Sequence, residues 1–304
     1  MKTVQAEPVV CIRHLGRRFD QKVALEDVSV EVKPGQVFGI VGENGAGKTT
    51  LIKHILGLYK AQAGTVKVFG NNPVAEPEST LSRIGYLSEE PDLPAWMKLS
   101  ELLNYTAAFY QHWDHRYAKE LIELFGLDLS STVRTLSKGM RAQLGLVLAQ
   151  AHRPDLLLLD EPSSGLDPNI RRDILAAIIR TVVDEGRTVI FSSHLLEEVQ
   201  RVSDHLVMLR SGQLLLSASM DDVLNKHHRF TLRCSSAPNF IDGDKRVLRS
   251  ASVGDEWQVD WYGNEHEFSR RAQACGVQIA QSVRLNLDEI FLVRSQAPTG
   301  RRLA

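Results

Sequence analysis

The chain has 304 residues, enough for one large domain and one smaller domain, because domains typically contain about 100 to 200 residues. Hydrophobic residues make up 43% of it and charged residues 24%, a composition that excludes disordered, collagen-like and membrane-embedded proteins. The 36 Lys and Arg residues nearly balance the 37 Asp and Glu residues, and a net charge of −1 argues against a partner that is a nucleic acid.

Two segments near the N-terminus are predicted to form antiparallel strands. Val9 to Ile12 and Val23 to Val32 are rich in β-branched residues, and the turn pair Pro34-Gly35 follows the second segment. Next, the apolar run Val37 to Val41 enters a glycine-rich turn, and Thr49 to Leu58 has helical spacing of its apolar residues. This order predicts a strand, a tight turn and a helix.

The glycine-rich turn carries the strongest motif of the chain. Gly42-Glu43-Asn44-Gly45-Ala46-Gly47-Lys48-Thr49 matches the P-loop pattern in the strand–turn–helix context that this pattern requires. Glycines let backbone N–H groups point at a phosphate, and the helix N-terminus favours an anion. We expect Lys48 to reach the β- and γ-phosphate oxygens of ATP, Thr49 to bind Mg²⁺ and Thr50 to donate a further hydrogen bond. A flexible glycine turn is the alternative interpretation.

The segment from Gly85 to about Asp155 is mainly helical in pattern. It holds eight of the twenty aromatic residues, and we expect a helical subdomain inserted over about residues 86–155. Core packing is the expected fate of most of these rings, while the remainder would form a groove for a partner. Within it, Leu136-Ser137-Lys138-Gly139-Met140 starts a helix, and a capping Ser followed by Gly makes an anion-ready helix start or a simple cap.

A second chemical motif ends the strand Leu156 to Leu159. Asp160 and Glu161 follow this buried strand directly, beside the expected position of the phosphate loop, and Pro162 stops the strand. We expect Asp160 to orient Mg²⁺ and Glu161 to polarise a water in line with the γ-phosphate. Taken alone, such a pair is more often a solvated strand end.

The α/β pattern then continues, and a different pattern replaces it after about Asn225. A helix is expected over Asn169 to Asp184 and a strand over Thr188 to Phe191, extending the same parallel sheet. Short alternating segments follow, such as Phe230 to Cys234 and Trp257 to Trp261, with polar breaks around Ser235 to Pro238 and at Gly263-Asn264. We expect a small α+β appendage there.

Cysteine usage and hydropathy indicate the compartment. Cys11, Cys234 and Cys275 lie far apart without a CxxC pair, as is typical of free thiols in a reducing compartment. Met1 to Leu15 lacks the apolar stretch of a signal peptide, and no window approaches about 18 uninterrupted apolar residues. We therefore expect any membrane role to depend on a partner.

In their order and spacing these motifs resemble the ATPase subunit of ABC transporters over nearly all of residues 8–225. The resemblance implies an α/β P-loop NTPase fold with an antiparallel β subdomain, a helical insertion over about 86–155 and a C-terminal accessory domain over 226–304. It implies ATP and Mg²⁺ as cofactors. Ser137 and Gly139 match the family's signature motif, Ser164 to Asp167 the loop that crosses a dimer, and His194 the γ-phosphate sensor.

The same resemblance assigns two further residues and shows two departures. Phe19 aligns with the aromatic residue that stacks on adenine. Glu89 fills the place of a Gln, and as an ionised carboxylate it can bind Mg²⁺ or water but cannot donate a hydrogen bond. Lys138 and Met140 replace a Gly and a Gln of the signature, and the added cation should favour anion binding.

These departures, together with Leu285 to Phe291, are similar to the branch whose ATPase and membrane subunits are separate chains and which mainly exports. The resemblance implies a multi-helix membrane subunit, a second ATPase subunit, identical or different, and a location at the cytoplasmic face of the membrane. The alternative is a soluble ABC ATPase in translation or DNA maintenance, which usually carries two cassettes or long coiled coils. Regulatory nucleotide binding without turnover is disfavoured by Glu161 and His194.

Overall fold

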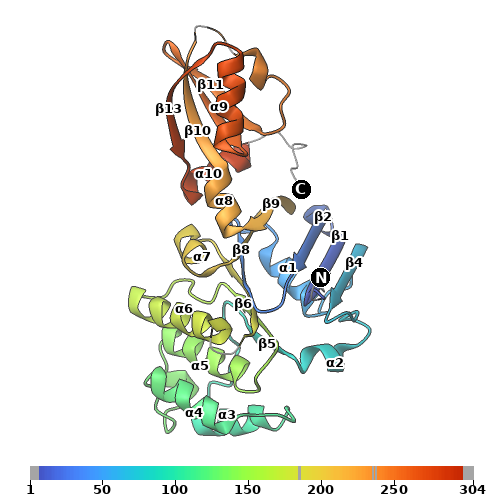
Figure 1. The fold of residues 1–304 in the computed structure, drawn as a ribbon. Coiled ribbons are helices and arrows are strands. Elements are labelled where there is room, and N and C mark those ends of the chain that lie inside the picture. Colours follow the sequence, from blue (N-terminus) through green and yellow to red (C-terminus); the bar gives the residue numbers. More distant parts are fainter. Residues whose placement is uncertain (1–6, 184–185, 235, 237, 297–304) are drawn as a thin grey trace, which may run out of the picture. The chain divides into compact units, whose positions relative to one another are not determined.

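The structure is a computed structural model that describes residues 7–183, 186–234, 236 and 238–296. The chain divides into two compact units, Met1–Ser203 with Leu209–Leu214, and Asp204–Met208 with Leu215–Ala304. Figure 1 shows the order of the elements along the chain. Among the described residues, no helix is both long and apolar enough to cross a membrane.

The N-terminal part of the first unit is an antiparallel sheet, as the sequence predicted. Its strands are β1 (Val10–Phe19), β2 (Lys22–Val32) and β4 (Ala63–Val68), in the order β2-β1-β4. Val10, Ile12 and Leu15 on β1 are buried, and β1 is the central strand, paired with β2 on one side and β4 on the other. The pairing registers shift between Ile12 and Leu15, so the alternation of apolar and polar residues is broken there.

A parallel sheet forms the centre of the first unit. Its strands include β3 (Val37–Val41), β5 (Ile84–Leu87), β6 (Leu156–Asp160) and β7 (Thr188–Ser193). The full order is β5-β6-β7-β3-β8-β9, with β8 (His205–Arg210) and β9 (Gln213–Ser219) leading from one unit into the other. Continuous apolar runs form strands that are buried on both faces.

The register of this sheet aligns the ends of three strands. Asp160 on β6 and Ile40 on β3 both pair with Ser192 on β7, and Val41 pairs with Ser193. The loops after β3, β6 and β7 therefore leave the sheet at the same edge. The helices that belong to this part are α1 (Lys48–Ile55), α6 (Pro168–Val183) and α7 (Leu196–Val202).

The segment expected to be helical, about residues 86–155, contains several helices. They are α3 (Leu99–Ala107), α4 (His115–Leu124), the 3₁₀ helix η1 (Val133–Thr135) and α5 (Lys138–Gln150), and the short helix α2 (Pro77–Leu81) precedes the segment. Leu99, Tyr117 and Leu144 belong to one apolar core, so part of the aromatic set packs inside. Trp96, Tyr105 and Phe109 remain exposed, at 71%, 52% and 69%.

The second unit contains an antiparallel sheet and helices, which confirms the expected α+β appendage. Phe230 stacks on Phe268 with ring centroids 3.8 Å apart, and Trp261 packs against Phe268 edge-on. The sheet order is β11-β12-β10-β13. The elements are α8 (Met220–Lys226), β10 (His227–Arg233), 3₁₀ helix η2 (Asn239–Ile241), β11 (Val247–Val253), β12 (Glu256–Tyr262), α9 (Glu265–Ala274), β13 (Gln278–Arg284) and α10 (Leu287–Gln296).

The fold class predicted from the sequence is therefore confirmed. Two details of the prediction include residues outside the described part: Asp184, the expected last residue of a helix, and Ser235 and Ala237 in the polar break after β10.

Candidate functional site

The phosphate loop joins β3 to α1 as the motif predicts. Gly45 and Gly47 have φ of 82° and 110°, a left-handed conformation that favours glycine. A Cβ on Gly47 would lie 2.6 Å from the Ala24 carbonyl oxygen, so a side chain does not fit there. Gly47 is also the N-cap of α1, and no side chain satisfies the cap. The free N–H groups at this helix start are therefore available to an anion.

Lys48 is held at the centre of the loop. Its Nζ donates a hydrogen bond to the Gly42 carbonyl oxygen at 2.6 Å and lies 2.9 Å from Glu161 Oε1. The Lys48 and Glu161 side chains are only 6% and 7% exposed, so the ion pair is shielded from water. The pair brings together two residues that the sequence placed in separate motifs.

The carboxylates Asp160 and Glu161 are fixed by β7 at the next strand end. Ser192 Oγ donates to Asp160 Oδ1 at 2.7 Å and accepts from the Glu161 backbone N–H at 2.9 Å. Burial, followed by the negative charge of Asp160, raises the pKa of Tyr86 to about 12. The hydrogen bond from Ser192 therefore holds the Asp160 side chain at this edge of the sheet.

Glu161 also contacts His194. His194 Nδ1 lies 2.7 Å from Glu161 Oε2, and the His194 backbone N–H donates to the same oxygen at 3.3 Å. An ionised carboxylate is purely an acceptor, so this contact suits the His194 tautomer that has its proton on Nδ1. Glu161 has φ of 50°, a left-handed conformation that is rare for a residue with a side chain. Such a conformation persists where the surrounding structure enforces it, and it is frequent at active sites.

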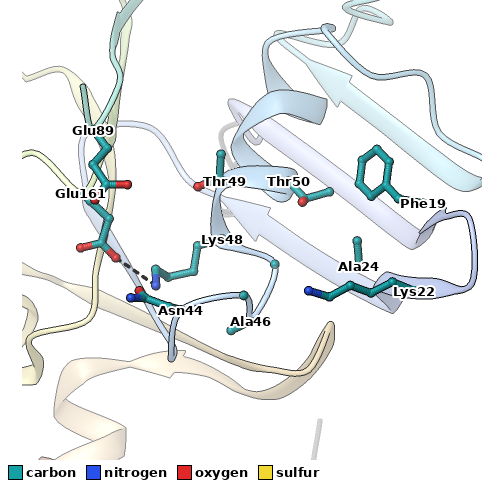
Figure 2. Close-up of a pocket in the computed structure, with 12 residues that line it drawn as sticks. Phe19, Lys22, Ala24, Asn44, Ala46, Lys48, Thr49, Thr50, Glu89 and Glu161 are labelled. Atoms are coloured by element: carbon teal, nitrogen blue, oxygen red, sulfur yellow. Dashed lines mark ion pairs between the residues drawn. The ribbon is translucent and has the colours of Figure 1, made fainter. Parts of the chain in front are cut away.

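A cavity of about 320 Å³ opens over the phosphate loop. Figure 2 shows Glu89 and Glu161 on one side of Lys48, and Phe19 on the other side beyond Thr50. Nine of its lining residues are among those predicted to bind ATP; Lys22 and Ala24 were not predicted, because neither belongs to a motif. The cavity is lined by Phe19, Lys22, Ala24, Asn44, Gly45, Ala46, Gly47, Lys48, Thr49, Thr50, Glu89 and Glu161.

Phe19 and Glu89 have different partners at the two sides of this cavity. Phe19 is 36% exposed and meets Tyr59 edge-on, with ring centroids 5.4 Å apart. The Arg17 guanidinium lies 4.5 Å from the Phe19 ring centroid. Glu89 Oε1 accepts a hydrogen bond from Ser164 Oγ at 3.1 Å. Both side chains line the cavity.

Other residues predicted for the site are outside the cavity lining. Ser137 is the N-cap of α5, where its Oγ accepts from the Met140 N–H at 3.2 Å. Asp167 Oδ1 accepts from the backbone N–H groups of Asn169 and Ile170, at 3.0 and 3.2 Å, and so caps the start of α6. Gly139 packs closely on Ile170. Within this one chain, the signature residues do not meet the phosphate loop.

The oxygen donors at the site suit magnesium chemistry. Thr49 and Glu89 line the cavity, and Asp160 lies at the sheet edge beside Glu161. Hydroxyl and carboxylate oxygens are the ligands that Mg²⁺ prefers, and Mg²⁺ usually completes its octahedron with substrate phosphates and water. Among the described residues, no group of three or more His, Cys, Asp or Glu could hold a metal by itself. The donor set therefore fits a metal that arrives with a phosphate ligand.

The chain matches known proteins over the part that carries this site. The family model described as ABC transporter covers residues 25–164. YdbJ, an ABC transporter ATP-binding protein of Bacillus subtilis, is 35% identical over 217 residues, which are 71% of this chain and 70% of YdbJ. BcrA, a bacitracin transport ATP-binding protein of Bacillus licheniformis, is 31% identical over 71% of either chain.

A solved structure gives the same result. The ATP binding subunit of an ABC transporter aligns with a TM-score of 0.66 and 30% identity, and the match covers 71% of this chain and 91% of that chain. Its fold agrees with the parallel sheet, the phosphate loop and the helical segment described above. The chain therefore belongs to the ABC transporter family, as an ATP-binding subunit that is an ATPase.

Proposed function

We propose that this ATPase drives the export of a substrate through a separate membrane subunit, from the cytoplasmic face of the membrane. The observation that carries the proposal is the sheet edge where Lys48, Glu161 and His194 meet. Its chemistry is that of ATP hydrolysis, and no helix among the described residues could itself cross a membrane. In this proposal ATP hydrolysis acts on a membrane subunit that is a separate chain.

In this proposal the phosphate loop binds the triphosphate of ATP. The backbone N–H groups of Gly42 to Gly47 and the start of α1 surround the phosphates, and Lys48 and Thr50 contact their oxygens. Thr49, Asp160 and Glu89 would hold Mg²⁺, which would neutralise part of the phosphate charge. Phe19, exposed at the far side of the cavity, would stack on the adenine ring.

Glu161 is proposed to act as the general base. Its carboxylate lies beside the loop that holds the γ-phosphate, and a carboxylate there can accept a proton from an attacking water. His194 holds Glu161 through two hydrogen bonds and would contact the γ-phosphate. The exposed His194 side chain, at 40%, has room to reach a ligand.

The signature residues support a head-to-tail dimer. Ser137 and Gly139 start α5 outside the cavity of their own chain, so they can contact a nucleotide held by another copy or by a related ATPase subunit. Asp167 and the loop from Ser164 would cross that interface. Each ATP would then lie between Lys48 of one subunit and Ser137 of the other.

The coupling to a membrane subunit is proposed to run through the loop after β5. Tyr86 to Ser88 line a second cavity of about 460 Å³, which is bordered by apolar side chains such as Leu93 and Leu148. Glu89, the next residue, lines the phosphate cavity. A cytoplasmic helix of the membrane subunit that docks on the helical segment, about residues 86–155, would thus move a residue that contacts the nucleotide.

We also propose domain limits of 8–225 for the ATPase domain and 226–304 for the accessory domain.

The first test is Glu161→Gln, which should keep ATP binding, abolish most turnover and trap an ATP-bound dimer, because Mg²⁺ ligation survives while the base is lost. Turnover at the wild-type rate would reject Glu161 as the base. Co-purification from detergent-solubilised membranes tests the class: a multi-helix membrane protein supports it, and ribosomes or DNA would overturn it.

A further inference from the structure

A buried carboxylate lies outside the phosphate cavity and contacts residues that neighbour those proposed for catalysis. Glu198 on α7 is 4% exposed and has no part in binding the nucleotide in the proposed mechanism. Its Oε2 accepts hydrogen bonds from Ser163 Oγ at 2.7 Å and from Ser193 Oγ at 2.8 Å. Its Oε1 lies 3.1 Å from Arg171 Nε on α6. One carboxylate thus joins the loop after β6, the end of β7 and the helices α6 and α7.

The two serines are close in the chain to Glu161 and His194, Ser163 in the loop after β6 and Ser193 as the last residue of β7. Ser163 follows Glu161 by two residues, and Ser193 directly precedes His194. Ser193 Oγ also accepts a hydrogen bond from the Leu195 backbone N–H at 3.0 Å, which closes the backbone around His194. Glu198 therefore fixes the backbone next to both Glu161 and His194. The side chains of these two residues contact each other at 2.7 Å.

The charge of Glu198 is needed for this arrangement. Two hydroxyl donors converge on a single oxygen, and hydrogen bonds to an ionised acceptor are shorter and stronger than those to a neutral one. The Arg171 side chain, 33% exposed, balances the buried negative charge. A glutamine at this position would keep the volume but weaken both serine contacts and leave Arg171 without a charge partner.

We infer that Glu198 is a positioning residue for ATP hydrolysis, which holds the Glu161 and His194 loops at the separation that hydrolysis requires. The inference rests on the proposed roles of Glu161 and His194. Because Glu198 contacts neither the phosphate loop nor the cavity, its loss should affect the hydrolytic step and spare nucleotide binding. It acts through its two serines.

The test is steady-state ATPase kinetics of the full chain carrying Glu198→Gln, with Ser163→Ala and Ser193→Ala as milder variants that each remove one donor. The matched control is Glu197→Gln, which changes an exposed carboxylate on the same helix. We expect Glu198→Gln to lower kcat about 10- to 100-fold, with KM and ATP affinity within about twofold of wild type. The control should keep wild-type kcat.

A double-mutant cycle separates positioning from a general loss of structure. In a His194→Ala background, Glu198→Gln should lower kcat by a smaller factor than in the wild-type background, because one of the two residues that it positions is gone. Wild-type kcat in Glu198→Gln, or equal fold losses in both backgrounds, would overturn the inference. If Glu198→Gln does not fold, the two serine variants decide by the same criteria. Wild-type turnover in Glu161→Gln and His194→Ala would instead overturn the proposed roles of Glu161 and His194, on which the inference rests.

Discussion

The buried ion pair between Lys48 and Glu161 should make Lys48→Ala strongly destabilising. Removing one partner of a buried pair leaves the other as an unpaired charge, at a cost of about 3 to 5 kcal/mol. Both side chains are almost fully buried, at 6% and 7% exposed, which places this pair in that class. Glu161 keeps its contact with His194 at 2.7 Å, so we expect the low end, about 3 kcal/mol.

The chain has two units, so the assay must measure the stability of the first unit separately. Amide hydrogen exchange resolves single strands: the amides of β3 and β6 report on the first unit, and those of β10 and β12 serve as the internal control. A loss of about 3 kcal/mol corresponds to a fall of about 150-fold in the protection of β6. Protection in β12 should not change.

A double variant, Lys48→Met with Glu161→Gln, tests whether the unpaired Glu161 charge causes the loss of stability. It removes both charges and keeps similar volumes, so most of the lost stability should return. If Lys48→Ala lowers the stability by less than about 0.5 kcal/mol, as is typical when an exposed ion pair is broken, the pair is solvated in solution. That result would contradict a stabilising buried ion pair. If the double variant is no more stable than the single one, the loss comes from packing instead.

Three further predictions concern other parts of the chain. Glu89→Gln should preserve ATP binding but change the stimulation of hydrolysis by the membrane subunit, because one negative charge near the γ-phosphate is removed; equal stimulation in variant and wild type would leave Glu89 without a coupling role. Phe19→Ala should weaken ATP binding about 5- to 150-fold through lost stacking, measured by calorimetry, whereas Phe109→Ala, an exposed ring outside the cavity, should not. Burial, together with the charge of Arg294, lowers the pKa of His227 to about 3, so between pH 6.5 and about 3 the unfolded chain binds a proton that the folded chain does not. Stability should therefore fall as the pH falls through this window, and His227→Asn should reduce the slope by up to about 1.4 kcal/mol per pH unit in urea unfolding; an unchanged slope would contradict the assignment.

Local patterns predicted the phosphate loop and the sheet well. The strand before Gly42 and the helix after Lys48 are read from contiguous residues, and the structure has both. The strand β1 extends to Phe19, far beyond the predicted Ile12. Its pairing register shifts after Ile12, so the alternation that identifies a strand is lost although the backbone pairing continues.

The contacts within the site were not predictable from one sequence. Lys48 and Glu161 meet because β6 and β3 flank β7 in the sheet, and strand order is a property of the fold rather than of any short segment. Glu198 has the same explanation, since Ser163 lies 35 residues before it. A glutamate in a helix start is usually solvated, so the sequence carried no signal for its burial.

The aligned strand ends also determine how this protein can change during evolution. Since Ile40, Ser192 and Asp160 lie in one row, deleting a single residue within β7 would withdraw His194 by about 3.3 Å and turn each following side chain to the opposite face. Insertions directly before Thr188, where β7 begins at the other edge of the sheet, would leave that row intact. Length variation among descendants of this sequence should therefore accumulate at one edge of the sheet, while the other edge keeps its residue count.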